Sequence, residues 1–289
     1  MGQYNFDQIL DRTHTKSLKY DFAVKRGKPA DVLPFWVADM DFEVPPELKQ
    51  ILLDRVNHGV FGYTESDDEY FKVLQNWFTT RFNWTPDRKW LVKTPGIVFA
   101  LAMAVRAFTN EGEGVLINQP VYYPFSMVID DNDRRLINVP LLKGEEKYTI
   151  DFEGIERAIV EENVTLFLLC NPHNPVGRVW TEDELKRLGD ICIKHNVLIV
   201  SDEIHADFVW KGHTHKVFAD LGESYAEHCI VCTAPSKTFN IAGLQVSNIF
   251  IPNDSLRRRF IKEIDRAGYS QLNTMGIVLS LIHISEPTR

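Results

Sequence analysis

Continuous apolar runs are the clearest pattern along this chain of 289 residues. Five of them have the length of strands, at 115–118, 164–170, 197–200, 229–233 and 247–251. Segments with the apolar spacing of helices lie between them. Strands that are apolar throughout and alternate with helices indicate a largely parallel sheet with helices on both faces. The pattern therefore predicts an α/β fold.

Polar residues mark where some of these helices begin. Ser66 with Glu69, and Thr181 with Glu184, have the spacing of a capping box, so helices are expected to start in the following residues. The loop 94–98 leads into the apolar stretch 99–105, which predicts another helix whose N-terminus directly follows a loop.

Composition narrows the class of protein. With 44% hydrophobic and 25% charged residues, the chain has the balance of a globular protein and enough apolar side chains for a core. The formal net charge of −8 argues against nonspecific nucleic-acid binding, which needs clustered cations. No apolar stretch approaches the roughly 20 residues that cross a bilayer, and the N-terminus has no signal-peptide core. We predict a cytoplasmic protein without nucleic-acid or membrane contacts.

Two residue pairs have the spacing of metal or redox sites, but we predict neither kind of site. Cys229 and Cys232 lie three apart in a predicted strand, where their side chains point to opposite faces, so chelation and a disulfide are both disfavoured. His213 and His215 lack a convincing third ligand, and a polar loop is the favoured interpretation. The cysteines are expected to be core thiols.

Candidate chemistry centres on Lys237, which directly follows Ser236 at the mouth of the predicted strand 229–233. A lysine becomes a Schiff-base nucleophile when its amine is desolvated beside an electrophilic carbonyl, and the neighbouring serine could bind a cofactor's phosphate. The pair alone is a weak signal, because most lysines are solvated surface charges. It gains weight if other segments supply the rest of a pyridoxal phosphate site.

Two such segments follow predicted strands. Asn174 lies in the proline-interrupted loop after 164–170, where it can donate to a phenolate oxygen. Asp202 lies just past the run 197–200, at a strand end of the kind where open α/β sheets bind ligands. Its carboxylate can pair with a pyridinium nitrogen, which makes the ring a better electron sink for a carbanion at the substrate's α-carbon.

Two further segments supply a phosphate site and a stacking surface. Where the loop 94–98 opens a helix, at Gly96, Ile97 and Val98, exposed backbone N–H groups and the positive helix end favour an anion without any basic side chain. Tyr122 and Tyr123 follow the run 115–118, and either of them can stack on a flat ring. The four segments together predict a pyridoxal phosphate site.

In these segments the chain resembles the fold-type I pyridoxal phosphate enzymes, and among them the MalY/PatB type of cystathionine β-lyase within the class I and II aminotransferases. The resemblance also covers 36–42, 62–64 and 236–243, and it continues in family order through about Val278. It implies a homodimer that binds pyridoxal 5'-phosphate. The implied reaction is β-elimination from L-cystathionine or a related cysteine S-conjugate to a thiol, pyruvate and ammonia.

The resemblance also implies roles for individual residues. Lys237 would bind the cofactor's aldehyde covalently, and Asp202 would hold its ring nitrogen. Asn174 would meet the ring oxygen, and Tyr122 would stack on the ring. The phosphate would be held by the backbone and side chains of five residues: Gly96, Ile97, Val98, Ser236, and Tyr63 from the neighbouring subunit.

Two departures from the aminotransferase pattern indicate the branch. Gln245 stands eight positions after Lys237, where an arginine is usual, and His205 stands three after Asp202, where a tyrosine is common. We expect His205 to be a cofactor-site residue, although a histidine after a strand can also satisfy buried backbone groups. Both departures disfavour an aminotransferase. The remaining alternative is a catalytically inactive module that binds the cofactor or a regulatory partner.

The domain organisation follows from the resemblance. We expect 1–45 to be an N-terminal arm with part of a small α+β domain, 46–278 to be the large cofactor-binding domain, and 279–289 to be a non-native tail. The small domain would then be incomplete, and the arginine that binds the substrate's α-carboxylate would lie outside this chain. That expectation is the reason for keeping the inactive module as an alternative.

Overall fold

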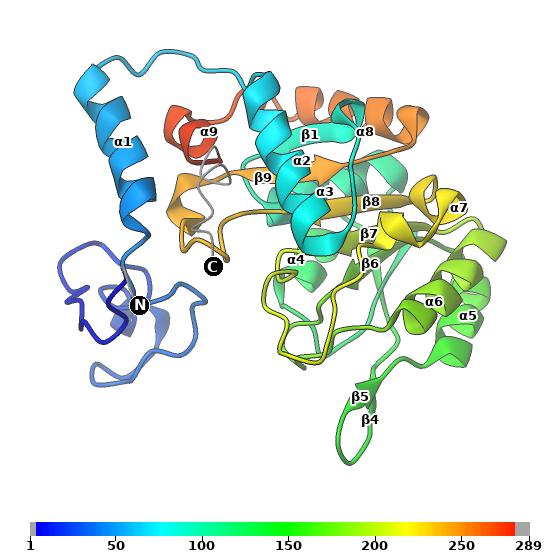
Figure 1. Ribbon diagram of the computed structural model, residues 1–289. Coiled ribbons are helices and arrows are strands. Elements are labelled where there is room, and N and C mark those ends of the chain that lie inside the picture. Colours follow the sequence, from blue (N-terminus) through cyan, green and yellow to red (C-terminus); the bar gives the residue numbers. More distant parts are fainter. Residues whose placement is uncertain (1–3, 281–289) are drawn as a thin grey trace.

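A central sheet organises the molecule, whose computed structural model describes residues 4–280 (Figure 1). Its seven strands run in the order β1-β9-β8-β7-β6-β2-β3. Only β9 is antiparallel to its neighbours, and all other pairings among the described strands of this sheet are parallel. The strands are β1 (Leu91–Thr94), β2 (Gly114–Ile117), β3 (Arg135–Asn138), β6 (Val164–Cys170), β7 (Leu198–Asp202), β8 (Cys229–Thr233) and β9 (Ser247–Phe250).

All five apolar runs are strands, so the predicted, largely parallel α/β sheet is confirmed. The structure adds strands β1 and β3 at the two edges of the sheet. It also adds a separate hairpin, β4 (Leu142–Lys143) with β5 (Tyr148–Thr149), which projects from the body of the molecule (Figure 1).

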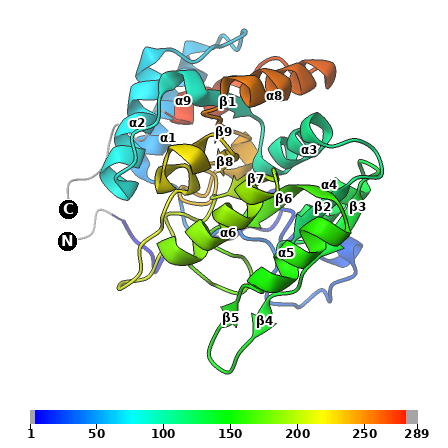
Figure 2. The same cartoon turned by 90° about the vertical axis from the view of Figure 1, so that its right-hand side faces the viewer.

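Helices cover both faces of the sheet (Figure 2). One face packs against α3 (Ile97–Phe108), α4 (Pro124–Asp130) and α8 (Asp254–Arg266). The other packs against α2 (Asp68–Phe82), α5 (Phe152–Glu161), α6 (Glu182–Lys194) and α7 (Glu223–Ala226). Short 3₁₀ turns complete the chain: η1 (Val24–Arg26), η2 (Arg88–Trp90), η3 (Phe218–Leu221) and η4 (Ala242–Leu244).

A third apolar cluster lies outside this three-layer body. The helices α1 (Pro46–His58) and α9 (Thr274–Ser280) pack together beside the sheet (Figure 1). Leu48 of α1, Leu279 of α9 and Ile241 form the centre of the cluster. Because Ile241 lies four residues after Lys237, this cluster also packs against the segment that carries the lysine. Of the predicted tail 279–289, residues 281–289 lie outside the described part of the chain. The domain boundary at 45/46 stays a prediction.

One of the two capping boxes is correct. The Thr181 side chain accepts from the Glu184 backbone N–H, and the Glu184 carboxylate accepts from the Thr181 backbone N–H, at the start of α6. The prediction of Ser66 as a cap is wrong, because Asp67 caps α2 by accepting from the Tyr70 N–H at 3.0 Å. A carboxylate next to the helix is the better cap, since it also interacts favourably with the positive helix end.

The two faces of the sheet explain the cysteine pair. Cys229 lies in the apolar layer under α2, α5 and α6, whereas Cys232 lies in the layer under α3 and α8. Both are free and fully buried, and burial raises the pKa of each thiol well above its ordinary value. The predicted core thiols on opposite faces are confirmed.

The buried aromatic side chain of Phe250 is expected to contribute to the free energy of unfolding. It is fully buried in β9, and the rings of Phe78 and Trp84 meet it edge-on at 5.2 Å between centroids. We expect Phe250→Ala to lower the free energy of unfolding by about 3–5 kcal/mol, because it removes the buried ring and leaves a cavity. Urea denaturation checks this value. Trp210→Ala, at an exposed aromatic side chain, is the control, and an equal loss in both variants would contradict the expectation.

Candidate active site

The carboxyl ends of neighbouring parallel strands bring the predicted residues together. The β-sheet register aligns Asp202 at the end of β7 with Cys170 of β6 on one side and Cys232 of β8 on the other. The loops that continue from β6 and β8 carry Asn174 and Lys237. The sheet thus gathers residues separated by dozens of positions in sequence.

Backbone hydrogen bonds join the loops that carry Tyr122 and Asn174. The Tyr122 N–H donates to the Asn174 carbonyl at 3.0 Å, and the imidazole Nε2 of His173 lies 3.0 Å from the Pro120 carbonyl. Burial is the main reason that the pKa of the Tyr122 phenol is raised, and the charge of Asp202 adds to it. The loops of Tyr122 and Asn174 therefore lie side by side, and Tyr122 lies close enough to Asp202 for their charges to interact.

Asp202 is a buried carboxylate with an open acceptor. Its side chain is almost fully buried, and burial, with a smaller contribution from the charge of Glu203, raises its pKa to about 7. Oδ1 accepts from the Ile204 N–H at 3.1 Å, while Oδ2 has no hydrogen-bond donor within residues 4–280. An anion so placed strongly favours a cationic partner, and a protonated ring nitrogen is such a partner.

Lys237 is half-buried in a turn that begins where β8 ends. The turn is closed by backbone bonds from Phe239 N–H to the Pro235 carbonyl and from Ile241 N–H to the Ser236 carbonyl, both 3.0 Å. Burial lowers the pKa of the Lys237 ammonium, while the negative charges of Asp39 and Asp202 oppose this effect. A lowered pKa increases the fraction of neutral amine, the form that attacks a carbonyl or takes a proton.

The backbone at the start of α3 is an anion site without a side-chain cap. No side chain caps Gly96, so the first N–H groups of the helix, from Ile97 and Val98, are left for another acceptor. Ser236 is half-buried on the turn that carries Lys237. Gln245 is exposed, with φ at 47°, and it supplies no positive charge where an arginine is usual.

His205 lies close enough to Lys237 for their charges to interact. Burial is the main cause of the lowered pKa of the His205 imidazole, and the positive charge of Lys237 lowers it further. Its ring also meets that of Phe208 at 6.1 Å between centroids. His205 is therefore next to the lysine in the structure, and its role as a cofactor-site residue stays a prediction.

Tyr63 lies away from the other predicted residues. Its side chain is 95% exposed on the connection between α1 and α2, although its neighbours are held in place. The Thr274 hydroxyl donates to the Gly62 carbonyl at 3.1 Å and lies 2.9 Å from the Thr64 hydroxyl. The tyrosine is thus exposed to solvent on an anchored segment, and its role in a neighbouring subunit stays a prediction.

The expected loop around His213 and His215 is present before η3, but His215 is not on its surface. His213 is exposed, but His215 is buried, and its Nε2 lies 2.8 Å from the Glu203 carboxylate. Glu203 also accepts from the Ser201 hydroxyl and the Phe218 N–H. His215 is therefore part of a buried polar network centred on Glu203. Within residues 4–280, no group of three or more His, Cys, Asp or Glu residues is arranged to hold a metal ion.

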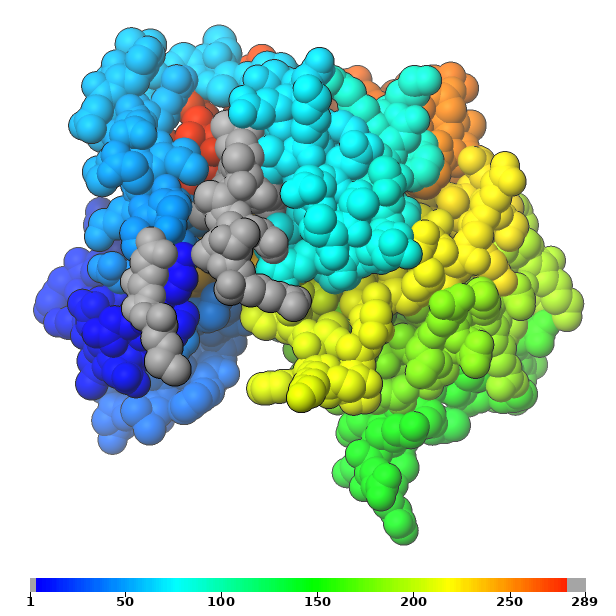
Figure 3. Space-filling view, viewed as in Figure 1, coloured from blue at the N-terminus to red at the C-terminus, as the bar shows by residue number. Residues whose placement is uncertain are grey.

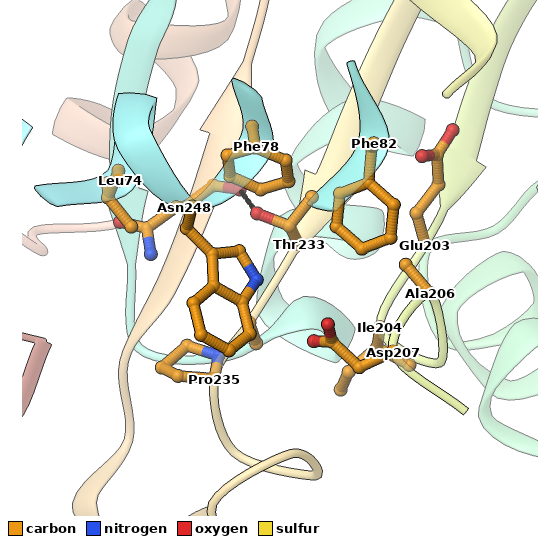
Figure 4. Close-up of a pocket in the computed structure, with 12 residues that line it drawn as sticks. Leu74, Phe78, Phe82, Glu203, Ile204, Ala206, Asp207, Thr233, Pro235 and Asn248 are labelled. Atoms are coloured by element: carbon orange, nitrogen blue, oxygen red, sulfur yellow. Dashed lines mark hydrogen bonds between the residues drawn. The ribbon is translucent and has the colours of Figure 1, made fainter. Parts of the chain in front are cut away.

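The structure adds residues that support the lysine turn. The Thr238 hydroxyl, next to Lys237, donates to Asp207 at 2.7 Å, and the Asn240 side chain bonds to the backbone of Met40 and Phe42. Asp207, Ile204 and Pro235 help to line a small cavity of about 30 Å³, in which Figure 4 shows Asp207 beside Ile204. Met40, Phe42, Thr238 and Asn240 lie within the segments 36–42 and 236–243 that carry the family resemblance, whereas Asp207 had no such signal. Local sequence does not show which distant groups these residues contact.

The N-terminal segment and the lysine turn line a common opening. In the space-filling view, the N-terminal residues stand apart from the loop after β7 (Figure 3). A cavity of about 660 Å³ lies between the N-terminal segment and the lysine turn, and its lining includes Phe6, Met40, Phe42, Phe239 and Asn240. This volume is sufficient for a small organic ligand.

Comparison with known proteins identifies the family to which this chain belongs. Residues 30–286 match the family described as aminotransferase class I and II, so the chain belongs to that family. It is 43% identical to cystathionine β-lyase PatB of Bacillus subtilis over 94% of this chain and 70% of that protein. It is 32% identical to protein MalY of Escherichia coli over 98% of this chain and 71% of that protein.

A solved structure gives the same picture. Cystalysin from Treponema denticola, whose crystal structure contains pyridoxal 5'-phosphate, superposes with a TM-score of 0.92 at 40% identity, over 98% of this chain and 72% of that one. The predicted fold-type I architecture is thereby confirmed, as is the resemblance to the MalY/PatB branch. None of the helices described between Tyr4 and Ser280 is long and apolar enough to cross a membrane.

Proposed function

We propose that this protein catalyses the pyridoxal 5'-phosphate-dependent β-elimination of L-cystathionine or a related cysteine S-conjugate, giving a thiol, pyruvate and ammonia. The convergence of Lys237, Asp202, Asn174 and Tyr122 at adjacent strand ends carries the proposal. The named relatives and the cystalysin structure support the choice of lyase over aminotransferase.

The residues present fit this cofactor. The open Oδ2 of Asp202 can accept the ring-nitrogen proton, and the uncapped start of α3 can bind the phosphate through backbone N–H groups. When bound, the cofactor supplies an aldehyde for the substrate amine and a ring that accepts the electron pair of the broken C–H bond.

Lys237 is proposed to act as the general base. With the cofactor bound, its amine would take the proton from the substrate's α-carbon. The lowered pKa of this amine increases the fraction of the neutral form, which can accept a proton. Asp202 would hold the proton of the ring nitrogen, Tyr122 would stack on the ring, and Asn174 would donate to the ring oxygen. Loss of the β-sulfur as a thiol and the addition of one water molecule give pyruvate and ammonia.

Product analysis tests the proposal. The purified chain with pyridoxal phosphate is mixed with L-cystathionine, and pyruvate and homocysteine are measured over time. Equal amounts of both products are expected from the lyase. Accumulation of pyridoxamine phosphate, discharged by a keto acid, would instead identify an aminotransferase, and cofactor binding without either product would identify an inactive module.

We also propose a homodimer that works in the cytoplasm. The exposed apolar side chains of Phe35, Val60, Phe61 and Tyr63 are candidates for burial against a second copy. The four free, buried cysteines agree with a reducing compartment.

Mixing of inactive variants tests whether Tyr63 serves the partner's site. Tyr63→Ala and Lys237→Ala are unfolded and refolded together in equal amounts. Half of the dimers are then hybrids with one intact site, so about a quarter of wild-type activity is expected. Lys237→Ala mixed with Asp202→Asn is the matched control, because both residues belong to the same subunit's site and no hybrid site is complete. Recovery in the control alone, or in neither mixture, would contradict the shared site.

A further inference from the structure

A side-chain clamp fixes the N-terminal segment against the lysine turn. The Asn240 Oδ1 accepts from the Met40 N–H at 2.9 Å, and its Nδ2 donates to the Met40 carbonyl at 2.9 Å and the Phe42 carbonyl at 3.1 Å. Asn240 stands three residues after Lys237, and Met40 directly follows Asp39. The clamp therefore brings Asp39 next to the turn that carries the lysine.

Arg12 and Lys19 hold this segment from its other side. Arg12 forms ion pairs with both Asp39 and Asp41, and Lys19 Nζ bonds to the Asp41 carboxylate at 2.8 Å and the Asp39 carbonyl at 3.1 Å. The two aspartates thus share a cation. Of these two carboxylates, only Asp39 acts as a charge on Lys237.

The Asp39 carboxylate is only half satisfied by this network. Its Oδ2 is bonded to Arg12, while its Oδ1 is buried and has no hydrogen-bond partner in the described part of the chain. Leaving a buried carboxylate oxygen unpaired is costly, so a donor is expected for it in the working protein. Arg12 fixes the orientation of the carboxylate and leaves this one oxygen available.

Three titratable groups interact with the Lys237 amine, and a fourth lies next to one of them. Asp39 approaches from the N-terminal segment and Asp202 from β7, and both act on Lys237 as negative charges. His205 comes from the loop after β7, and the lowered pKa of its imidazole favours the neutral form. Tyr122 comes from the loop after β2 and interacts with Asp202. If the ring nitrogen of a bound cofactor occupies Asp202, then Asp39 is the carboxylate that remains for the lysine.

We propose that Asp39, oriented by Arg12, is the counter-ion of the Lys237 ammonium and positions that amine. The pair is not hydrogen-bonded in the arrangement described here, and the flexible lysine side chain closes it once the amine is protonated. Within the proposed function, on which this use rests, Asp39 stabilises the lysine after it has taken the α-proton. Asp39 acts through Lys237 and is therefore a positioning residue.

The test measures the amine itself, without the cofactor or catalysis. The cofactor-free full chain is labelled with trace acetic anhydride across a pH series, and mass spectrometry quantifies the Lys237 peptide relative to exposed Lys211. Because loss of a nearby negative charge destabilises the ammonium, Asp39→Asn is expected to move the inflection to lower pH, with about threefold or greater labelling below the wild-type inflection. Asp39→Glu is expected to restore part of the wild-type profile.

Asp41→Asn is the matched control. It also removes a carboxylate paired with Arg12, but no interaction with Lys237 is expected, so the inflection should stay in place. A merely structural role for Asp39 would give the opposite sign, because detachment of the segment solvates Lys237 and raises its inflection toward that of an ordinary lysine. The proposal is overturned by such a rise, by no change in Asp39→Asn, or by an equal shift in Asp41→Asn. A missing lyase activity would not affect this outcome.

Discussion

Replacement of Lys237 by alanine is expected to abolish pyruvate release from cystathionine. The variant lacks both the nucleophile that attaches the cofactor and the base that takes the α-proton, so a loss of roughly 10⁴-fold or more in turnover is expected. The strand ends and the start of α3 are unchanged by the substitution, so noncovalent cofactor binding can persist.

Two measurements on the same samples check this expectation. The visible absorption band that depends on covalent attachment should disappear in Lys237→Ala, while equilibrium dialysis still detects bound cofactor. Lys211→Ala, at an exposed loop position, is the control and should keep both band and turnover. Substantial pyruvate release by Lys237→Ala would refute the role of this lysine.

The second large effect is expected for Asp202→Asn. An amide has nearly the shape of the carboxylate but cannot hold the ring-nitrogen proton by charge. Electron withdrawal from the α-carbon weakens, and kcat is expected to fall by roughly 100-fold or more, about 2.7 kcal/mol of barrier. Asp202→Glu is the comparison, since it keeps the charge. Full turnover in the amide variant would remove Asp202 from the mechanism.

The same substitution should act on stability in the opposite direction. The buried Asp202 has its pKa raised to about 7, above the value of 3.8 for an unperturbed group, so the folded, cofactor-free chain binds this proton more tightly than the unfolded chain. Its contribution to stability is therefore present below about pH 4 and is lost as the pH rises to about 7. Above pH 7, Asp202→Asn should unfold at higher temperature than wild type. If the melting temperatures of Asp202→Asn and wild type differed by the same amount at pH 5 and at pH 8, this expectation would be contradicted.

The sequence predicted the centre of the sheet well and its edges poorly. Strands such as β6 and β8 are buried on both faces and therefore appear as unbroken apolar runs. The edge strands β1 and β3 contain Lys93 and Arg135 and lack such a run. The antiparallel direction of β9 was equally hidden, because an apolar run is the same in either direction.

For the site, chemistry that follows a strand end was visible in the sequence, and chemistry supplied by distant segments was not. Asp202 and Lys237 stand where the sheet ends, so their convergence follows from parallel strands. The burial of His215 was not predicted, because its partner Glu203 lies twelve positions earlier across a loop. Asp39 gained a role only when the structure placed its segment beside the lysine turn.

The clamp between Asn240 and Met40 has a consequence for how the protein folds. It joins residues 200 positions apart, so its formation closes a very long loop and carries a large entropic cost. Contacts of this range slow folding and are expected to form after the more local strand pairs of the sheet. The reactive lysine would then stand exposed on a nearly finished sheet until the N-terminal segment docks, which makes docking the step that completes the site.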